Sequence, residues 1–544
     1  MSSIPQRRDF LKMAGLLGGG LSLGSVTGVG AAPATAADLM RHWANVREHG
    51  VEPGGTTKNT AALNRLIQTI GRAGGGTIYF PPGVYLTGAL HLVSNLTLWL
   101  DAGARLVFSE DFDDYLPMVP SRWQGVEVNN FSPLIYGVKL DNVTIAGRGE
   151  IDGSGAVWWD YVLKLRATMR AKPDTPLSKW QEIHRDENGG KVGQSFGFLR
   201  PPLLQLHHCT NVRVEGVTFR NAPFWTTHFV NCDGVTVDGI AVLTPDSPNT
   251  DGVNPESSRN VMIANCRFHT DDDCITIKSG KRYPGQPADF AACENITITN
   301  CVMTKGASGV GIGSEMSGGV RRVIVTNCVM DGTWGGIHIK TIRGRGGVVE
   351  DLEFSNIVMK NIHGHSAVHL NMLYWEKTER QPVTETTPLF RNLRFNNLRC
   401  DSTQAAVLIE GLEEQRIENV SFNHSDFAGS TGFTVRDADG VRLNDVRVAA
   451  ESGPALICDR VNRLDVSGFA ALGNSATAAP AITLHDVTAS SLDRCGYAGG
   501  AKPYVDVSGA GSQWLRVRDP DLTVDDGAIK VGGDVGQDVV KTSR

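Results

Sequence analysis

A short phrase recurs along this chain of 544 residues and constrains the fold more than any other feature. Each copy is a turn-forming residue followed by alternating apolar residues, and the copies are separated by about 25 to 35 residues. The copies begin at Asn142, Asn211, Gly234, Asn260, Asn295, Arg322, Asn392 and Arg416. No helical pattern separates them, so the repeat unit is a set of short strands joined by turns. Stacking such units predicts an all-β fold, a parallel β-helix in which each coil buries its apolar residues against the next.

Two further residue types recur at the same spacing. A cysteine follows an asparagine at Cys266, Cys301 and Cys328, which predicts stacked, buried, reduced thiols in place of disulfides. None of the ten cysteines has the spacing of a zinc site, and we expect no metal and no cofactor. Asparagines at equivalent turns are expected to form a ladder of side-chain hydrogen bonds and are assigned to structure: Asn265, Asn300, Asn327 and Asn356.

The two ends of the chain differ from its repetitive middle. Residues 1–37 contain Arg7 and Arg8, then an apolar, glycine-rich run and a small-residue stretch, a pattern typical of a twin-arginine signal peptide. We therefore expect a periplasmic or secreted protein with no membrane anchor in its mature form. Residues 38–133 are expected to form the N-terminal cap and first coils, with a short amphipathic helix from Asn59 to Gly71 that covers the open end.

Residues 134–500 are expected to form the catalytic β-helix. One charged segment within it, residues 158–197, lacks strand alternation and predicts a surface insertion that walls one end of a cleft. The repeat fades over residues 501–544, which predicts a terminal cap or tail. The net charge of −6 does not favour a nucleic-acid partner, and we expect a monomer.

Three aspartates suggest the chemistry. Asp251 precedes Asp272 and Asp273 by about one coil length, so the three carboxyl groups are expected to share one patch. An acid pair is usually a solvated face, but this pair runs directly into the apolar alternation Ile275, Ile277, where a strand begins. Strand alternation would send neighbouring side chains to opposite faces, so the chain must bend at the pair.

Crowded carboxyl groups suit glycoside cleavage. That reaction needs one protonated carboxyl for the leaving oxygen and one ionised carboxylate to activate water. Mutual repulsion is expected to raise the pKa of at least one of the three acids. The spacing alone does not say which acid keeps its proton.

The chain resembles glycoside hydrolase family 28, the polygalacturonases and rhamnogalacturonan hydrolases, from about Val51 to Arg416. The resemblance is carried by the phrases Asn249-Thr250-Asp251-Gly252, Asp272-Asp273-Cys274-Ile275 and Gly313-Ser314-Glu315, with Arg200-Pro201-Pro202 and the glycine-rich turn at Arg343. It implies a right-handed parallel β-helix and hydrolysis of α-linked galacturonic acid chains with inversion, by acids roughly 6.5 to 9.5 Å apart.

The resemblance also implies roles for individual residues. Asp272 matches the position of the family's general acid, and Asp251 and Asp273 match the positions of the acids that position and activate the water. Lys340 matches a cation that holds the substrate carboxylate, and Asn249, Tyr374 and Arg343 match positions near the substrate, against the plain alternatives of packing and surface exposure.

Two positions depart from the family pattern. His338 stands where the family usually has an arginine that holds the substrate carboxylate, and we expect it to contact the substrate as well. Ala307 stands where polygalacturonases have a histidine beside the acids. These departures favour altered specificity, as in a rhamnogalacturonan hydrolase or other pectic glycosidase, or a non-catalytic carbohydrate-binding β-helix. A polysaccharide lyase that uses calcium and a basic residue is a further alternative on the same architecture, although the sequence offers no obvious basic catalytic centre.

Overall fold

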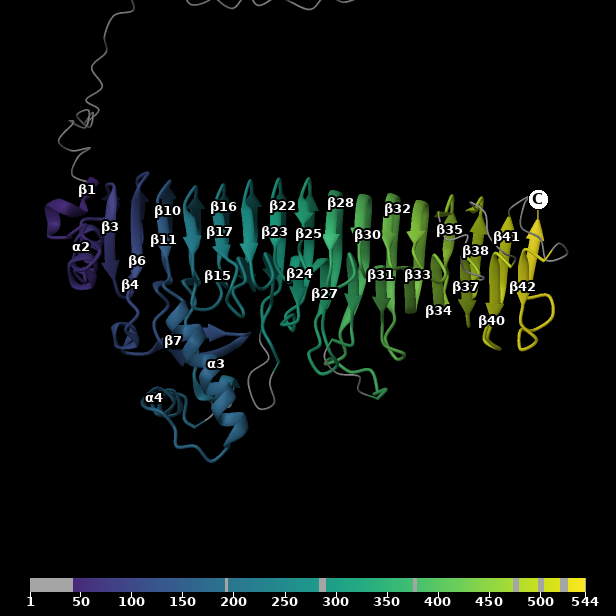
Figure 1. Cartoon of the computed structure of the whole chain (residues 1–544), viewed down its shortest axis with the longest axis horizontal. Coiled ribbons are helices and arrows are strands. Elements are labelled where there is room, and N and C mark those ends of the chain that lie inside the picture. Colours follow the sequence, from purple (N-terminus) through teal and green to yellow (C-terminus); the bar gives the residue numbers. More distant parts are fainter. Residues whose placement is uncertain are drawn as a thin grey trace, which may run out of the picture. The chain divides into compact units, whose positions relative to one another are not determined.

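The computed structural model describes residues 43–190, 194–282, 290–374, 379–472, 479–497, 503–518 and 527–543. The expected signal peptide lies outside these residues. From Trp43 onward the chain is a right-handed parallel β-helix whose coils stack along one axis (Figure 1). Among the described residues, no helix is long and apolar enough to cross a membrane.

Most coils contribute one strand to each of three rows, and in each row a strand pairs in parallel with its counterpart in the next coil. The first row will carry the candidate site. It contains β4 (Leu90–His91), β9 (Ile135–Val138), β12 (Leu204–His207), β15 (Thr227–Val230), β18 (Val253–Glu256), β21 (Ile275–Ile277), β24 (Ser308–Gly313), β27 (Gly335–Lys340), β29 (Val368–Asn371), β31 (Ala405–Glu410), the start of β33 (Thr431–Ala450), β34 (Leu456–Asn462), β37 (Ile482–His485), β40 (Val505–Ser508) and β42 (Ile529–Val531).

The second row adjoins the first across a corner of the coil. It contains β1 (Trp43–Asn45), β2 (Gly76–Phe80), β5 (Leu96–Leu100), β10 (Asp141–Gly147), β13 (Thr210–Glu215), β16 (Asp233–Asp238), β19 (Arg259–Ala264), β22 (Cys293–Thr299), β25 (Val320–Thr326), β28 (Val348–Ile362), β30 (Leu389–Ser402), β32 (Ile417–Gly429), the middle of β33, β35 (Asp465–Ser467), β38 (Thr488–Asp493), β41 (Gln513–Arg518) and β43 (Val540–Ser543).

The third row completes each coil. It contains β3 (Gly83–Thr87), β6 (Ala104–Phe108), β11 (Glu150–Asp152), β14 (Thr218–Arg220), β17 (Ala241–Thr244), β20 (Arg267–Thr270), β23 (Val302–Lys305), β26 (Val329–Asp331), the ends of β28, β30, β32 and β33, β36 (Ala470–Leu472) and β39 (Gly496–Tyr497). Three short 3₁₀ helices interrupt the loops: η1 (Val46–His49), η2 (Phe112–Tyr115) and η3 (Gln194–Gly197).

Repeated side chains hold the coils together, as the sequence predicts. All ten cysteines are buried as reduced thiols. At one corner the asparagines occupy the left-handed region and form the predicted ladder, since Asn300 donates to Asn265 at 3.3 Å and Asn356 donates to Asn327 at 3.3 Å. Inside the stack, Phe354, Phe395 and Phe422 lie face to face with centroids 5.2 and 4.5 Å apart.

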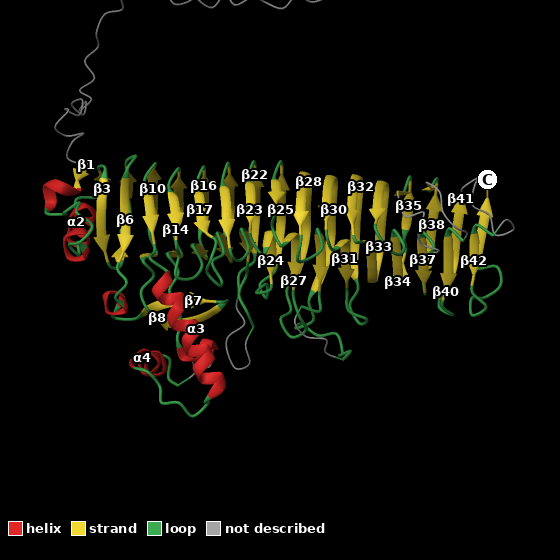
Figure 2. Cartoon of the chain, in the orientation of Figure 1, coloured by secondary structure: helices red, strands yellow, loops and turns green. Residues whose placement is uncertain are grey.

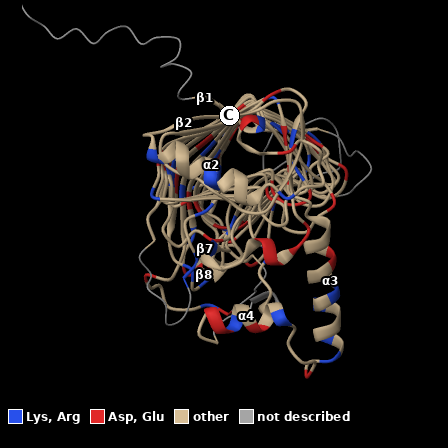
Figure 3. Ribbon diagram, turned by 90° about the vertical axis from the view of Figure 1, so that its left-hand side faces the viewer, with Lys and Arg blue, Asp and Glu red and all other residues tan. Residues whose placement is uncertain are grey.

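Few elements lie outside the stack (Figure 2). Helix α2 (Thr60–Arg72) lies across the end of the stack that faces the viewer in Figure 3, and its buried face, Leu63, Leu66, Ile67 and Ile70, confirms the predicted capping helix. Helices α3 (Ala156–Ala171) and α4 (Lys179–Glu187) lie beside the stack with the antiparallel hairpin β7 (Val119–Trp123) and β8 (Val126–Asn130). Both helices fall largely in the segment predicted to be a surface insertion.

Candidate active site

The pairing of β18 with β21 brings two of the three aspartates into register. Val253 pairs with Ile275, so Asp251 and Asp273, each two residues earlier, occupy the same position on neighbouring coils. The Gly252 N–H donates to the Asp273 carbonyl at 3.0 Å, which continues the pairing up to the acids. The interval between these acids in the sequence is thus one coil.

Asp272 lies in the break between β20, which ends at Thr270, and β21, which starts at Ile275. Its carboxylate accepts hydrogen bonds from Asn249 Nδ2 at 3.2 Å and from the Asp273 N–H at 2.9 Å. Asp272 is half-buried, whereas Asp251 and Asp273 are each only 2% exposed. Asp272 is therefore the acid of the three that a substrate reaches most easily.

Two buried lysines neutralise part of this negative charge. Lys278 Nζ lies 3.5 Å from Asp251 and 3.3 Å from Glu315, and Lys340 Nζ donates to Asp273 at 2.8 Å. The sequence alone does not distinguish an acid-stabilising Lys278 from a solvated surface lysine at the end of a strand, and the structure buries it. No role for Glu315 followed from the sequence analysis, although Glu315 lies in one of the motifs that carry the family resemblance.

These contacts separate the pKa values of the acids. Burial, and then the charge of Asp273, raises the pKa of Asp272, while burial and the charge of Asp272 raise the pKa of Asp251 well above its usual range. Burial alone would raise the pKa of Asp273, but Lys340 and Lys278 outweigh it and hold that pKa below the usual range. Lys278 and Arg345 likewise outweigh burial and hold the pKa of Glu315 at about 2. The site thus contains an ionised Asp273 beside carboxyl groups that retain a proton more readily.

A buried arginine fixes the orientation of Asn249. Arg200 donates to the carbonyls of Pro223 at 2.9 Å and Pro248 at 2.7 Å, and to Asn249 Oδ1 at 2.9 Å. Because Oδ1 accepts from Arg200, Nδ2 of the same amide points at Asp272. Asn249, predicted to bind substrate, holds Asp272 in this structure; its contact with substrate stays a prediction.

The segment that carries all these acids also matches a known family. Residues 179–443 match the family model described as glycosyl hydrolases family 28. The chain belongs to glycoside hydrolase family 28. A second model, described as rhamnogalacturonase A/epimerase, pectate lyase-like, matches residues 43–105 in the first coils.

Relatives of this family 28 hydrolase are polygalacturonases. A probable polygalacturonase of Vitis vinifera is 28% identical over 75% of this chain and 79% of its own length. An endo-polygalacturonase of Pectobacterium parmentieri is 29% identical over 65% of this chain and 80% of its own length. Among solved structures, an exopolygalacturonase from Thermotoga maritima is 29% identical, with a TM-score of 0.62 over 76% of this chain and 95% of that one.

Glycine at position 311 makes room for the acid cluster of the hydrolase. A Cβ added to Gly311 on β24 would lie 2.8 Å from Asp273 Oδ2 and 3.2 Å from the side chain of Thr276. We therefore expect Gly311→Ala to displace the Asp273 carboxylate and to lower kcat by about 10–100-fold, because small displacements of reacting groups are costly. Steady-state kinetics on oligogalacturonides measures this. Gly533→Ala, which meets no atom within 4 Å, is the matched control.

Three predicted substrate ligands lie together beside the acids. The Tyr374 ring lies 5.3 Å from Lys340 Nζ and 5.6 Å from the His338 ring, and His338 stacks on His369 at 4.8 Å. Burial, and then the charge of Lys340, holds the pKa of His338 well below its usual range. The imidazole is therefore neutral and supplies no replacement for the positive charge of an arginine.

The two arginines of the glycine-rich turn differ in their surroundings. Arg343 pairs with Glu414 through two short contacts, 2.5 and 2.9 Å, so a carboxylate of the protein already occupies its guanidinium. Its contact with substrate stays a prediction. Arg345 is almost fully buried and its Nη1 has no hydrogen-bond partner within the described residues. The sequence alone does not indicate which of these two arginines is the better candidate to bind a substrate carboxylate, since only the fold shows which guanidinium is already paired.

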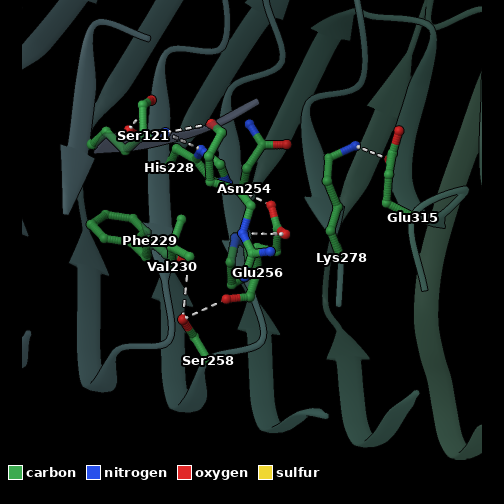
Figure 4. A network of polar contacts seen from close by, with 12 residues as sticks. Ser121, His228, Phe229, Val230, Asn254, Glu256, Ser258, Lys278 and Glu315 are labelled. Atoms are coloured by element: carbon green, nitrogen blue, oxygen red, sulfur yellow. Dashed lines mark hydrogen bonds and ion pairs between the residues drawn. The ribbon is translucent and has the colours of Figure 1, made fainter. Parts of the chain in front are cut away.

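The hairpin β7–β8 covers the first row of strands on one side of the acids. A network of buried polar contacts fixes it there (Figure 4): Ser121 donates to Gln205 at 2.7 Å, Gln205 donates to His228 Nδ1 at 2.8 Å, and His228 Nε2 lies 2.8 Å from Glu256. Since Nδ1 accepts, Nε2 carries the proton and donates to the carboxylate. Arg122 of the hairpin pairs with the same Glu256 at 3.3 Å.

The tip of the hairpin reaches the edge of the acid cluster. The Gly125 carbonyl accepts from the Lys281 N–H at 3.1 Å, and a Cβ on Gly125 would lie 3.0 Å from the Glu315 side chain. The outer face of β12, β15 and β18 is thus closed on this side. Within the described residues, no group of three or more His, Cys, Asp or Glu side chains is arranged to hold a metal ion.

Proposed function

We propose that this family 28 hydrolase is exported and cleaves α-linked galacturonate chains from one end, with inversion at the anomeric carbon. The observation that carries the mechanism is the ion pair between Lys340 and Asp273, 2.8 Å long, beside the half-buried Asp272. A fixed negative charge next to Asp272 favours the protonated form of that carboxyl group, as a general acid requires.

The reaction assigns one role to each acid. Asp272 gives its proton to the glycosidic oxygen as the bond from that oxygen to C1 breaks. The ionised Asp273 takes a proton from a water molecule that Asp251 helps to position, and the oxygen of that water bonds to C1 on the opposite face. The product sugar therefore leaves with inverted configuration, and Asp272 is recharged from solvent.

Recognition of the uronate requires cations near the acids. Lys340 and Arg345 are the two that suit this role, since Arg345 Nη1 is buried without a partner and a substrate carboxylate would supply one. The neutral His338 and the Tyr374 hydroxyl are suited to bind sugar hydroxyl groups. Export is supported by the N-terminal sequence pattern.

The position of the hairpin β7–β8 supports cleavage from a chain end. A polymer that runs through an open groove needs free space on both sides of the acids, and here β7–β8 covers the strands on one side. Two relatives are named for exo action, the Thermotoga maritima structure and an exo-poly-α-D-galacturonosidase of Dickeya chrysanthemi. The second candidate substrate is rhamnogalacturonan, which Ala307 and His338 favour over a typical polygalacturonase substrate.

Product analysis tests the proposal. On a galacturonate hexamer, we expect early release of monomer or dimer from one end and β-configured product by proton NMR before mutarotation. Random fragments would contradict the exo assignment, and an α-configured product would contradict inversion. Release from rhamnogalacturonan fragments alone would select the second candidate, while an unsaturated product that absorbs ultraviolet light would indicate a lyase.

A further inference from the structure

A second concave surface lies on the second row of strands, over the last coils of the protein. We name it the C-terminal groove and define it by the lining residues on or beside β30, β32, β33, β35, β38, β41 and β43, in the green to yellow part of Figure 1. Its volume is about 830 Å³. None of the acids of the candidate active site lines it.

Two ridges that run along the coil axis form the groove. The first ridge is the corner of the coils, where every residue has positive φ. It consists of Asn392, Asn419, Gly440, Arg463, Ala489 and Trp514, of which Gly440 and Ala489 have no long side chain. The second ridge is an outward-facing row two residues further on: Arg394, Ser421, Arg442, Asp465, Ser491, Arg516 and Lys541. With a coil spacing of ~4.8 Å, the second ridge extends over about 29 Å.

The groove is strongly basic although the whole chain is acidic. Its lining contains four arginines and a lysine against a single carboxylate, Asp465. Arg442 pairs with Asp465 at 3.5 Å and Arg463 pairs with Asp439. Arg394, Arg516 and Lys541 form no ion pair with any residue that the structure describes, so a ligand with spaced negative charges would find them available.

Trp514 adds an aromatic surface to this row of cations. Its side chain is 73% exposed, and its backbone has φ 51°. The equivalent corner positions of other coils carry Asn392 and Asn419, residues that adopt the left-handed region readily. A tryptophan there serves neither the corner geometry nor the core. Its broad indole face is available to the C–H face of a sugar ring.

We propose that the C-terminal groove binds a polymer of uronic acids and retains it on the enzyme at a distance from the acid cluster. Carboxylates along the chain would meet the unpaired cations, and a sugar ring would cover Trp514. The choice of uronate over other polyanions rests on the function proposed above. Retention raises the effective concentration of chain ends near the active site without any new contact there.

The test measures binding of unbranched polygalacturonate by affinity electrophoresis in the Asp272→Asn background, in which hydrolysis is expected to be strongly slowed. We expect the triple variant Arg394→Ser/Arg516→Ser/Lys541→Ser to weaken binding at least fivefold, and Trp514→Asn at least threefold. Both changes use residues that other coils carry at the same positions, Ser421 and Asn392, so the coils are expected to keep their structure. High salt should remove most of the difference between the triple variant and its parent.

Matched controls are Arg213→Ser, on the same outward row in an early coil, and Trp99→Ala, an exposed indole outside the groove; both should bind as their parent does. Unchanged binding in the groove variants overturns the proposal, as does equal competition by DNA at the same charge concentration. If the wild type hydrolyses short oligomers but the groove variants bind the polymer as tightly as their parent, the groove proposal alone is overturned. Retention without hydrolysis by the wild type overturns the proposed function alone.

Discussion

Replacing Asp272 by Asn should lower kcat on galacturonate oligomers by about 10²–10⁴-fold, with little change in KM. The amide keeps the size of the carboxyl group and its contact with Asn249, but it has no proton acidic enough to give to the leaving oxygen. Steady-state kinetics measures the loss. In the wild type, activity should fall as the pH rises through the raised pKa of Asp272, because the deprotonated form is inactive.

The neighbouring residue supplies the control for Asp272. Asp271 is exposed and lies 3.8 Å from Lys305, so Asp271→Asn should retain activity within about twofold of the wild type. A retained kcat in Asp272→Asn would assign the proton donor elsewhere, and Asp251, whose pKa is also raised, would be the next residue to replace.

Replacing Lys340 by Met should cost about 3–5 kcal/mol in the free energy of unfolding, because it leaves the Asp273 carboxylate buried without its cation. The pKa of Asp273 is depressed in the folded wild type, so the pair contributes its stability above the unfolded pKa of about 3.9 and loses it as the pH falls through the folded value. Urea unfolding at several pH values should show the largest difference between wild type and variant above about pH 5, and a shrinking one below about pH 4.

A double variant separates the stability of the pair from its role in the reaction. Lys340→Met/Asp273→Asn removes both charges and should recover much of the lost stability while remaining inactive. Lys305→Met, at a partly exposed surface lysine, should change the free energy of unfolding by less than about 0.5 kcal/mol. An equal loss of stability in the single and double variants would show that the buried charge is not the cause.

The repetition in the sequence accounts for how much of the fold was predictable. Most strands are short, but their phrase recurs at similar intervals, so the parallel stack, the asparagine ladder and the buried thiols follow from periodicity. The capping helix follows from helical spacing of Leu63, Leu66, Ile67 and Ile70. The hairpin β7–β8 had no repeated signal, and its closure over the strands depends on partners more than eighty residues away, such as Ser121 with Gln205.

The candidate site was predictable in part for the same reason. Asp251 and Asp273 are one coil apart, which a sequence interval can reveal. The pairing of Arg343 with Glu414, the burial of Arg345 Nη1 without a hydrogen-bond partner and the burial of Lys278 depend on loops and neighbouring coils that no local pattern specifies. The role of Glu315 was missed although its motif was noted, because its partner lies on another coil.

In a stack whose coils contact only their immediate neighbours, the terminal coils unfold locally before the central ones. In this protein helix α2 covers one end of the stack, and the acids lie at β18 and β21, many coils from Lys541 at the other end. Heating should therefore loosen the terminal coils first and leave hydrolysis of short oligomers intact for longer than capture of the polymer.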